Sequence, residues 1–235
     1  KNADMKALSD KFKDELLVAI IKDNIPDAKY FKGRGIDKKI VLATGLFKNP
    51  YNYFSEDLIV GKYKNMDYTT SDVTMTEMIE SYDMNGRRIR TEVPSFKGKF
   101  IGIDLINNKD LVVIVTEKTK SFENAFKNKY TKVETESMAF NKKFYTVATS
   151  QHDAFYVLTP QLQEKMLELE TKFRGSINFV FKDGFLYLLI NDGRDSLEIY
   201  PNNKIDEKFY RSILSDITIG CAVIDEFSLD SLKWS

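Results

Sequence analysis

Cysteine and histidine are almost missing from this chain of 235 residues, which has one of each, Cys221 and His152. A single cysteine excludes an intramolecular disulfide and any zinc site built from several cysteines. A single histidine excludes sites that need two or more histidine ligands. Sites made of carboxylates alone are still allowed, because hard cations prefer oxygen ligands.

Long hydrophobic runs are also missing. A helix that spans a bilayer needs about 20 mostly apolar residues, and the longest candidate, Ile213–Phe227, is interrupted by Asp216, Asp225 and Glu226. No signal peptide is visible. The chain begins at Lys1 without an initiator methionine, so we expect a processed form or a fragment, with any membrane anchor outside these residues.

An excess of charge of one sign is absent too. Lysine plus arginine and aspartate plus glutamate both number 35, so the formal net charge is zero. Proteins that bind nucleic acid along a whole face usually carry an excess of basic residues, and we therefore expect no nucleic-acid partner. A hydrophobic content of 43% and a charged content of 30% are ordinary for a globular protein.

The first half of the chain changes from a helical to an alternating pattern. Residues from about Ala3 to Ile25 place Met5, Leu8, Phe12, Leu16, Ala19 and Ile20 at three- and four-residue steps, which predicts an amphipathic helix ended by Pro26. Ile40–Ala43 reads as a short strand or the end of a turn. From Phe54 to Glu117 the period is two, with turn signals at Asn85-Gly86, Pro94-Ser95 and residues 107–110. We expect an antiparallel meander of about five strands there.

The second half is most informative at Phe140–Ile190. Phe144–Ala148 reads as a strand, Thr159-Pro160 as the start of a helix over Gln161–Phe173, and Asp183-Gly184 as a two-residue hairpin turn. Lys204–Asp225 predicts a C-terminal helix. The fold class is therefore α+β, with antiparallel β-meanders flanked by N-terminal, middle and C-terminal helices. The chain forms either one unit over residues 1–235 or two packed lobes, about 1–130 and 131–235.

Two blocks of this sequence resemble a bacterial family known as domain of unknown function 3137. The first runs from Asp57-Leu58-Ile59-Val60-Gly61-Lys62-Tyr63 through Tyr68–Val73 to Phe96–Phe100, and the second from Phe140–Tyr156 through Leu158-Thr159-Pro160 to Gly184-Phe185-Leu186-Tyr187. The blocks are built from turn and core residues. The resemblance implies a soluble part that follows hydrophobic segments, and it implies no activity, cofactor or catalytic residue.

Arginine is concentrated at one place in the chain. If Pro94-Ser95 is a hairpin tip, Arg90 lies opposite Lys99, and Arg88 shares their face two residues along. We therefore predict an exposed basic patch for phosphate, lipid head groups or an acidic partner, formed by Arg87, Arg88, Arg90, Lys97 and Lys99. The alternative interpretation is a solvated face that discourages edge pairing.

Three other groups of residues have ordinary structural explanations. Cys221 and His152 could form a nucleophile pair, but Cys221 lies in an apolar run without positive neighbours, which predicts a buried, inert thiol. Lys32-Gly33-Arg34-Gly35 lacks the spacing of a phosphate-binding loop and predicts a simple loop. Turn chemistry explains Asp183, Asp192 and Asp195 better than a calcium loop does.

No catalytic group is complete, so the sequence favours a non-enzymatic binding or scaffolding module. The resemblance implies a location on the cytoplasmic face of a bacterial membrane. The basic residues predict contact there with anionic lipid or an unidentified protein partner. We predict no metal and no cofactor. The alternatives are a hydrolase that uses carboxylates and a homo-oligomer whose assembly is its function.

Overall fold

The computed structural model describes residues 3–105, 110–126, 128–199 and 204–231. All nine strands belong to one antiparallel sheet with the order β1-β2-β3-β4-β9-β8-β5-β7-β6. The strands are β1 Lys29–Phe31, β2 Asn52–Tyr63, β3 Met66–Tyr82, β4 Arg88–Asp104, β5 Val112–Glu117, β6 Thr131–Val133, β7 Phe144–Ala148, β8 Ser176–Lys182 and β9 Phe185–Asn191. The predicted α+β class is confirmed.

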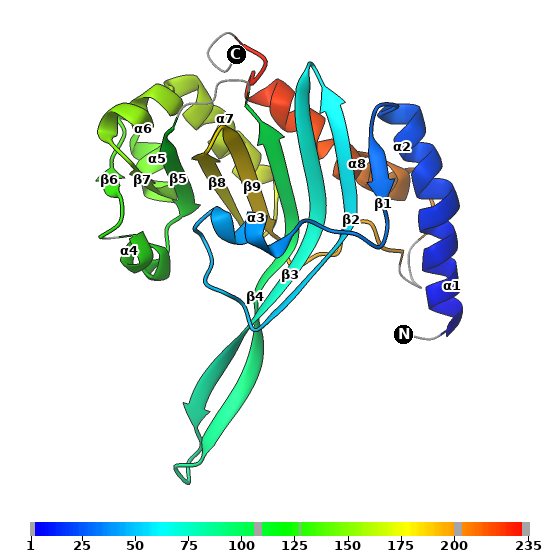
Figure 1. Ribbon diagram of the computed structural model, residues 1–235, viewed down its shortest axis with the longest axis horizontal. Coiled ribbons are helices and arrows are strands. Elements are labelled where there is room, and N and C mark those ends of the chain that lie inside the picture. Colours follow the sequence, from blue (N-terminus) through cyan, green and yellow to red (C-terminus); the bar gives the residue numbers. More distant parts are fainter. Residues whose placement is uncertain (1–2, 106–109, 127, 200–203, 232–235) are drawn as a thin grey trace.

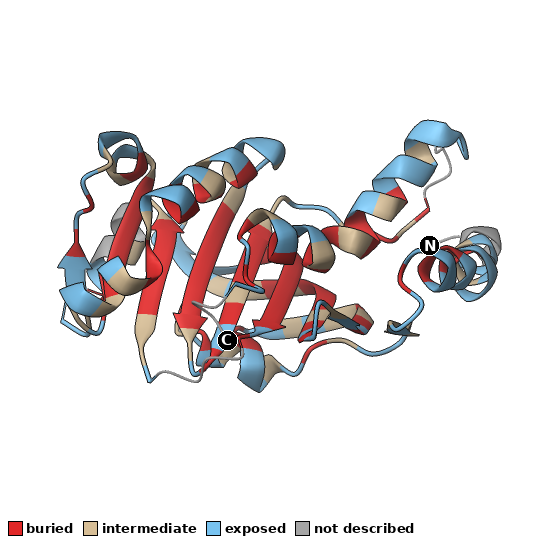
Figure 2. Ribbon diagram, turned by 90° about the horizontal axis from the view of Figure 1, so that it is seen from above, coloured by how far each residue is buried: buried red, intermediate tan, exposed pale blue. Residues whose placement is uncertain are grey.

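Helices cover the two faces of the sheet unequally (Figure 1). The described helices are α1 Ala3–Lys11, a π-helical segment η1 Phe12–Leu17, α2 Val18–Asn24, α3 Lys38–Ala43, α4 Lys120–Phe126, α5 Met138–Lys143, α6 Gln151–Val157, α7 Pro160–Lys172 and α8 Glu207–Glu226. One apolar core joins the sheet to the N-terminal helix and to α5 through α8, and includes Leu17, Ile101 and Ile217. A smaller core on the opposite face joins it to α3 and α4 through Val41 and Phe126. The central strands are buried on both faces (Figure 2).

The N-terminal helix is confirmed, but its predicted apolar face is partly wrong. Leu8 and Leu16 are 43% and 41% exposed, whereas Phe12 and Leu17 are buried. From Phe12 onward the cause is the π-helical turn between α1 and α2, which widens the helix and rotates the following residues relative to an α-helical count. The adjacent residues Phe12 and Lys13 are both buried as a result.

Three further expectations about the first half of the chain are corrected. Ile40–Ala43 is neither strand nor turn but lies in α3, which Asp37 caps by accepting a hydrogen bond from the Lys39 amide at 2.7 Å. Pro94-Ser95 is not a hairpin tip, because β4 runs through it with only a bulge opposite Met75 and Thr76. The strand β5 does not follow β4 in the sheet, because the β8–β9 hairpin lies between them. The turn expected at residues 107–110 falls mainly outside the described residues.

Local signals in the second half are confirmed. The hydroxyl of Thr159 accepts a hydrogen bond from the Leu162 amide, and Pro160 occupies the first turn of α7. Asp183 and Gly184 have φ angles of 51° and 77°, as a two-residue hairpin turn of this type requires. Helix α8 matches the predicted C-terminal helix. Among the described residues, no helix combines the length and the apolar composition needed to cross a bilayer.

Candidate functional site

The five predicted basic residues do not form one exposed patch. Arg90 lies opposite Glu80, and Lys99 lies opposite Asp72, so the predicted pairing of Arg90 with Lys99 is wrong. The error follows from Pro94, which occupies a bulge within a continuous strand and does not reverse the chain. The partners of β4 therefore come from β3 and β9.

The basic side chains are instead divided between the surface and the core. Arg88 and Arg90 both form ion pairs with Glu80. Lys99 is only 5% exposed and pairs with Asp72 at 3.0 Å. Lys97 is half-buried opposite Thr74, and Arg87 follows the turn at the end of β3. Whether any of the five contacts an anion stays a prediction.

The residues around these arginines form a two-stranded ribbon that leaves the sheet (Figure 1). Strand β2 pairs with β3 as far as Thr76, and β9 pairs with β4 only from Lys99 to Asp104. Residues 77–82 and 88–93 therefore pair only with each other among the described strands. We call residues 77–93 the arm.

The turn at the tip of the arm is where the sequence placed it, with a different geometry. The Gly86 amide donates to the Asp83 carbonyl at 3.0 Å, and Gly86 has a φ of 73°. The Asp83 side chain accepts hydrogen bonds from the amides of Asn85 and Arg87, both at 2.8 Å. The turn is thus a four-residue turn closed by glycine, not the two-residue turn that Asn85-Gly86 suggested.

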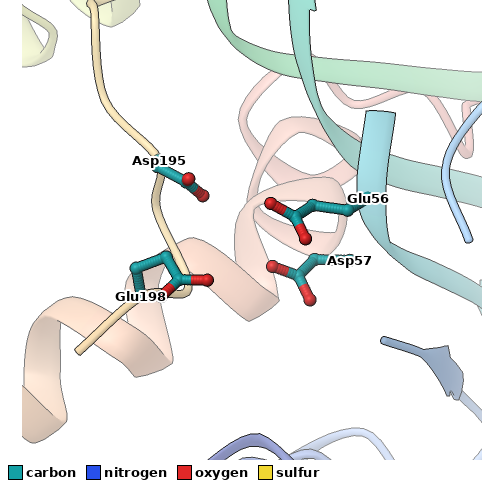
Figure 3. A group of neighbouring side chains, drawn as sticks. All are labelled: Glu56, Asp57, Asp195 and Glu198. Carbon is teal, nitrogen blue, oxygen red and sulfur yellow. The ribbon is translucent and has the colours of Figure 1, made fainter. Parts of the chain in front are cut away.

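A second group of polar residues lies where β2 meets the segment that precedes α8. Carboxylate oxygens of Glu56, Asp57, Asp195 and Glu198 lie within 4.8 Å of one another. Figure 3 shows the four side chains facing one another from these two segments. We call them the carboxylate cluster. Strand β2 can turn Asp57 inward because it has a bulge between Glu56 and Ile59, and Asp57 adopts a φ of 55° there.

A buried lysine compensates part of this negative charge. Lys13, on the π-helical segment, places its Nζ 2.6 Å from Asp57 and 2.7 Å from Glu198, and is 3% exposed. The Tyr30 hydroxyl donates to Asp57 at 2.5 Å, and the Ser9 hydroxyl donates to Glu198 at 2.9 Å. Burial opposes the charge of Lys13, but the hydrogen bonds to both carboxylates outweigh it and raise the pKa of its ammonium group.

The remaining two carboxylates are poorly compensated. Burial raises the pKa of Glu56 to about 7; Lys13, 4.0 Å away, opposes the shift and nearby carboxylates add to it. Burial and the charge of Asp72 raise the pKa of Asp195 to about 6. One lysine faces four carboxylates, and a proton held by Glu56 near neutral pH, joined by one on Asp195 in mild acid, reduces the net negative charge of the cluster.

A second ionic group adjoins the first. Lys99 and Asp72 form a buried pair, and Asp72 also accepts hydrogen bonds from the amide and hydroxyl of Ser196 at 2.8 Å. Burial raises the pKa of Asp216, on α8, to about 6. The short segment between β9 and α8 is thereby tied to β3 by Ser196 and to the N-terminal helix by Glu198.

The carboxylate cluster and Lys13 form what we call the clamp, a set of buried ionic contacts that holds separate segments of the chain together. Oxygen ligands suit hard cations, but the Lys13 ammonium already lies at hydrogen-bond distance from two of the four carboxylates. The cluster joins the N-terminal helix, β2 and the segment before α8. Lys32, in the loop that resembles a phosphate-binding loop only in composition, adds ion pairs to Asp10 and Asp14 of the same helix.

Sequence reasoning missed this cluster. Asp195 was assigned to turn chemistry alone, and the other three carboxylates and Lys13 carried no recognised motif. One signal was available, because Lys13 stands between the apolar residues Phe12 and Leu16 in a helix that must pack against the sheet. A lysine in such a place needs a buried counter-ion.

The nucleophile pair finds no support in the positions of its members. His152 lies on the exposed side of α6, and Cys221 lies on α8 beside Tyr68. Cys221 is half-buried, so the expectation of a buried thiol holds only in part. Burial raises the pKa of this thiol, which lowers its reactivity near neutral pH.

Comparison with known proteins identifies the family. The model of the family described as "Protein of unknown function (DUF3137)" matches residues 94–229, which is more than half of the chain. The chain belongs to this family. The match begins at Pro94, directly after the arm, and extends through α8, so it includes Asp195 and Glu198 of the carboxylate cluster but not Lys13, Glu56 or Asp57.

Two other comparisons concern the curated proteins and the solved structures. None of the curated proteins matches the chain. The crystal structure of the mycobacterial trehalose monomycolate transport factor A, TtfA, is similar with a TM-score of 0.46 and 6% sequence identity, over 90% of this chain and 96% of that chain. We derive no function from a likeness of this size.

Proposed function

We propose that this member of the DUF3137 family is a non-enzymatic binding or scaffolding module that holds a protein partner with its arm. The observation that carries the proposal is the apolar surface of the arm. Ile79, Tyr82, Met84 and Ile89 are 50%, 73%, 104% and 43% exposed. A two-stranded ribbon is at best marginally stable by itself in water, and a partner that covers exposed apolar side chains on such a ribbon would stabilise it.

The arm's charge supports a protein partner better than an anionic membrane. Arg88 and Arg90 share the carboxylate of Glu80, which reduces the positive potential that a lipid surface would need. The arm carries four acidic residues, Glu77, Glu80, Asp83 and Glu92, against three arginines. A location on the cytoplasmic face of a bacterial membrane stays a prediction that follows from the family resemblance alone.

Two of the four carboxylates in the cluster are already held by other side chains. Asp57 is fully buried and held by Lys13 and Tyr30, and Glu198 is held by Lys13 and Ser9. We therefore do not extend the proposal to hydrolysis.

Photo-crosslinking in the cells that naturally make the protein tests the proposal. A photoreactive amino acid replaces Ile79 or Ile89 on the arm, and in a control it replaces the exposed Lys165 of α7. We expect a discrete covalent adduct from the arm positions and none above background from position 165, because only the arm would lie against a partner. Equal labelling from all three positions, or no adduct from the arm, would overturn the proposal.

A further inference from the structure

A groove of about 280 Å³ lies between α8 and the segment that precedes it. One wall is a single stripe of α8, made of residues at three- and four-residue steps: Phe209, Ser212, Ile213 and Asp216. The other wall comes from residues 193–198, which we call the strap. The stripe is about 10 Å long at about 1.5 Å per residue. A groove of this size suits a small ligand or a single side chain.

Carboxylates outnumber cations in the lining of the groove. The described lining includes Asp195, Glu198 and Asp216 and a single cation, Arg194. Arg194 is engaged with a neighbouring aspartate at 2.6 Å. Figure 3 shows Asp195 and Glu198 on the strap, and Lys13 already holds Glu198. The uncompensated negative charge of the groove therefore rests on Asp195 and Asp216.

Asp216 is the residue that points most directly to a ligand. It is only 8% exposed. No described residue donates a hydrogen bond to its carboxylate, and its ion pair with Arg194 spans 3.9 Å. Burial outweighs the attraction of Lys99 and Arg194 and raises the pKa of Asp216 to about 6, so the carboxylate is charged at neutral pH. A buried charge without hydrogen-bond donors is costly, and a cationic ligand would remove that cost.

The ligand must reach Asp216 from the groove, because the opposite side is closed. The space between Asp216 and Lys99 is about 10 Å³, which is room for no more than one water. Asp195 has an unfilled position of the same kind, since its Oδ1 is buried and accepts no hydrogen bond within the described part of the chain. Two carboxylates that line one groove thus lack donors.

An organic cation fits this lining better than a metal ion does. A hard cation needs several oxygens close together, and Asp216 does not belong to the group of described carboxylates that converge within 4.8 Å. Phe209 is half-buried and Ile213 is buried, so the wall beside Asp216 is apolar. Apolar surface of this kind accommodates an alkyl chain, as it does for the stems of lysine side chains.

We infer that the groove binds a primary alkylammonium group, which donates to Asp216 while its alkyl chain lies along Phe209 and Ile213. An ammonium group has three donors, and hydrogen bonds between two charged groups are among the strongest in proteins. Asp195 adds to the attraction for the cation. The groove contains no residue of the arm, so this inference goes beyond the proposed function and does not depend on it.

Titration of the isotope-labelled full chain at neutral pH, followed by NMR, tests the inference with 1,5-diaminopentane as the probe. We expect the backbone amides of residues 193–198 and 209–216 to shift, with a dissociation constant of about 1 mM or lower. Pentane-1,5-diol has the same length without charge and should shift none of them. Absence of these shifts with the diamine, or equal shifts with the diol, would overturn the inference.

Two variants that each remove a carboxylate from α8 test the role of Asp216. Asp216→Asn should raise the dissociation constant at least about fivefold, because a neutral amide loses the charge-assisted hydrogen bond. Glu207→Gln changes an exposed carboxylate that does not line the groove and should alter it by less than about twofold. Equal weakening by both variants would refute the assigned contact.

A second pair of variants leaves every buried group in place. Ser212→Lys puts a competing ammonium group into the groove, whereas Ser215→Lys puts one on an exposed part of the same helix outside it. We expect Ser212→Lys to abolish the shifts and Ser215→Lys to keep the dissociation constant within about threefold of wild type. Unchanged binding in Ser212→Lys would overturn the location of the site, and circular dichroism verifies the fold of each variant.

The same ammonium chemistry occurs on free diamines and on lysine side chains of proteins, and a second probe separates these sources. Nα-acetyl-lysine amide presents one lysine side chain. A dissociation constant at least about tenfold lower for 1,5-diaminopentane would assign a free diamine, and comparable constants would assign a lysine side chain. Failure of both probes to bind would refute the site and leave the proposed role of the arm untouched.

Discussion

Lys13 links the N-terminal helix to the sheet through buried ion pairs. Its Nζ lies 2.6 Å from Asp57, whose side chain is fully buried, and 2.7 Å from Glu198. A buried ion pair contributes little net stability compared with an apolar pair of similar size, but removing one partner leaves a charge without compensation. The clamp is therefore sensitive to the loss of Lys13.

We expect Lys13→Met to lower the free energy of unfolding by about 3 kcal/mol or more at neutral pH, because Asp57 and Glu198 lose their cation. The loss should be smaller in mild acid, where the carboxylates become protonated. Urea titration at two pH values measures both effects. Lys11→Met changes an exposed residue of the same helix and serves as the control. Equal losses in the two variants would contradict the clamp.

The raised pKa of Glu56 makes the free energy of unfolding depend on pH, and the direction of the pKa shift gives the sign of this dependence. Burial raises this pKa to about 7, whereas an unfolded glutamate titrates near about 4.3. Between these values the folded state holds a proton that the unfolded state has lost, so the free energy of unfolding decreases as pH rises from about 4 to about 7. Denaturant titrations across that window should show the decline.

The matched variants identify the group responsible. Glu56→Gln should flatten this slope in part, leaving the contributions of Asp195 and Asp216, whose pKa values burial raises to about 6. Glu15→Gln, at an exposed position on the same helix as Lys13, should leave it unchanged. An unaltered slope in Glu56→Gln would show that Glu56 titrates normally.

Helix caps and short turns were predictable because each is decided by a few neighbouring residues. Thr159-Pro160 and Asp183-Gly184 carry their own hydrogen-bonding and φ preferences, and the structure confirms both. Pro94-Ser95 has a similar composition, yet it lies inside β4. A proline can occupy a bulge as well as a turn, and the choice depends on β3 and β9, which are distant in sequence.

Substitution in the turn between β8 and β9 tests how strictly such a short turn requires its backbone conformation. Gly184 has a φ of 77°, which a β-branched residue resists, so Gly184→Val should lower the free energy of unfolding by more than about 1 kcal/mol. Gly33 lies in an open loop with nothing near its absent Cβ, and Gly33→Val should stay within about 0.5 kcal/mol of wild type. Denaturant titration of both variants decides, and a neutral Gly184→Val would contradict the assigned turn.

The order of the sheet and the carboxylate cluster could not be predicted because both join segments far apart in the chain. Lys13 and Glu198 are separated by more than 180 residues. Strand β4 pairs with β9, although β5, β6, β7 and β8 lie between them in the sequence. The alternation of polar and apolar residues predicts which segments form strands, but it does not predict which strands pair. The predicted pairing of Arg90 with Lys99 was wrong for the same reason, since a single misplaced turn exchanged the partners of both residues.

The arm should be dispensable for folding, since neither apolar core includes any of its residues. Thr76 and Pro94 lie opposite each other where the ribbon leaves the sheet, so Asn-Gly in place of residues 77–93 can close the same hairpin. We expect this variant to keep its sheet and to change the melting temperature by less than about 4 °C, which corresponds to about 1 kcal/mol for a chain of this size.

The same shortened chain should lose the protein partner that the arm is proposed to hold. Affinity purification from the cells that naturally make the protein is expected to recover a partner with the tagged intact chain but not with the tagged shortened chain, and thermal unfolding followed by circular dichroism verifies that both chains are folded. A shortened chain that still recovers the same partner would place the contact elsewhere on the molecule. A shortened chain that fails to fold would show that the arm stabilises the sheet, which its pairing pattern does not suggest, because β2 and β9 hold β3 and β4 in place without it.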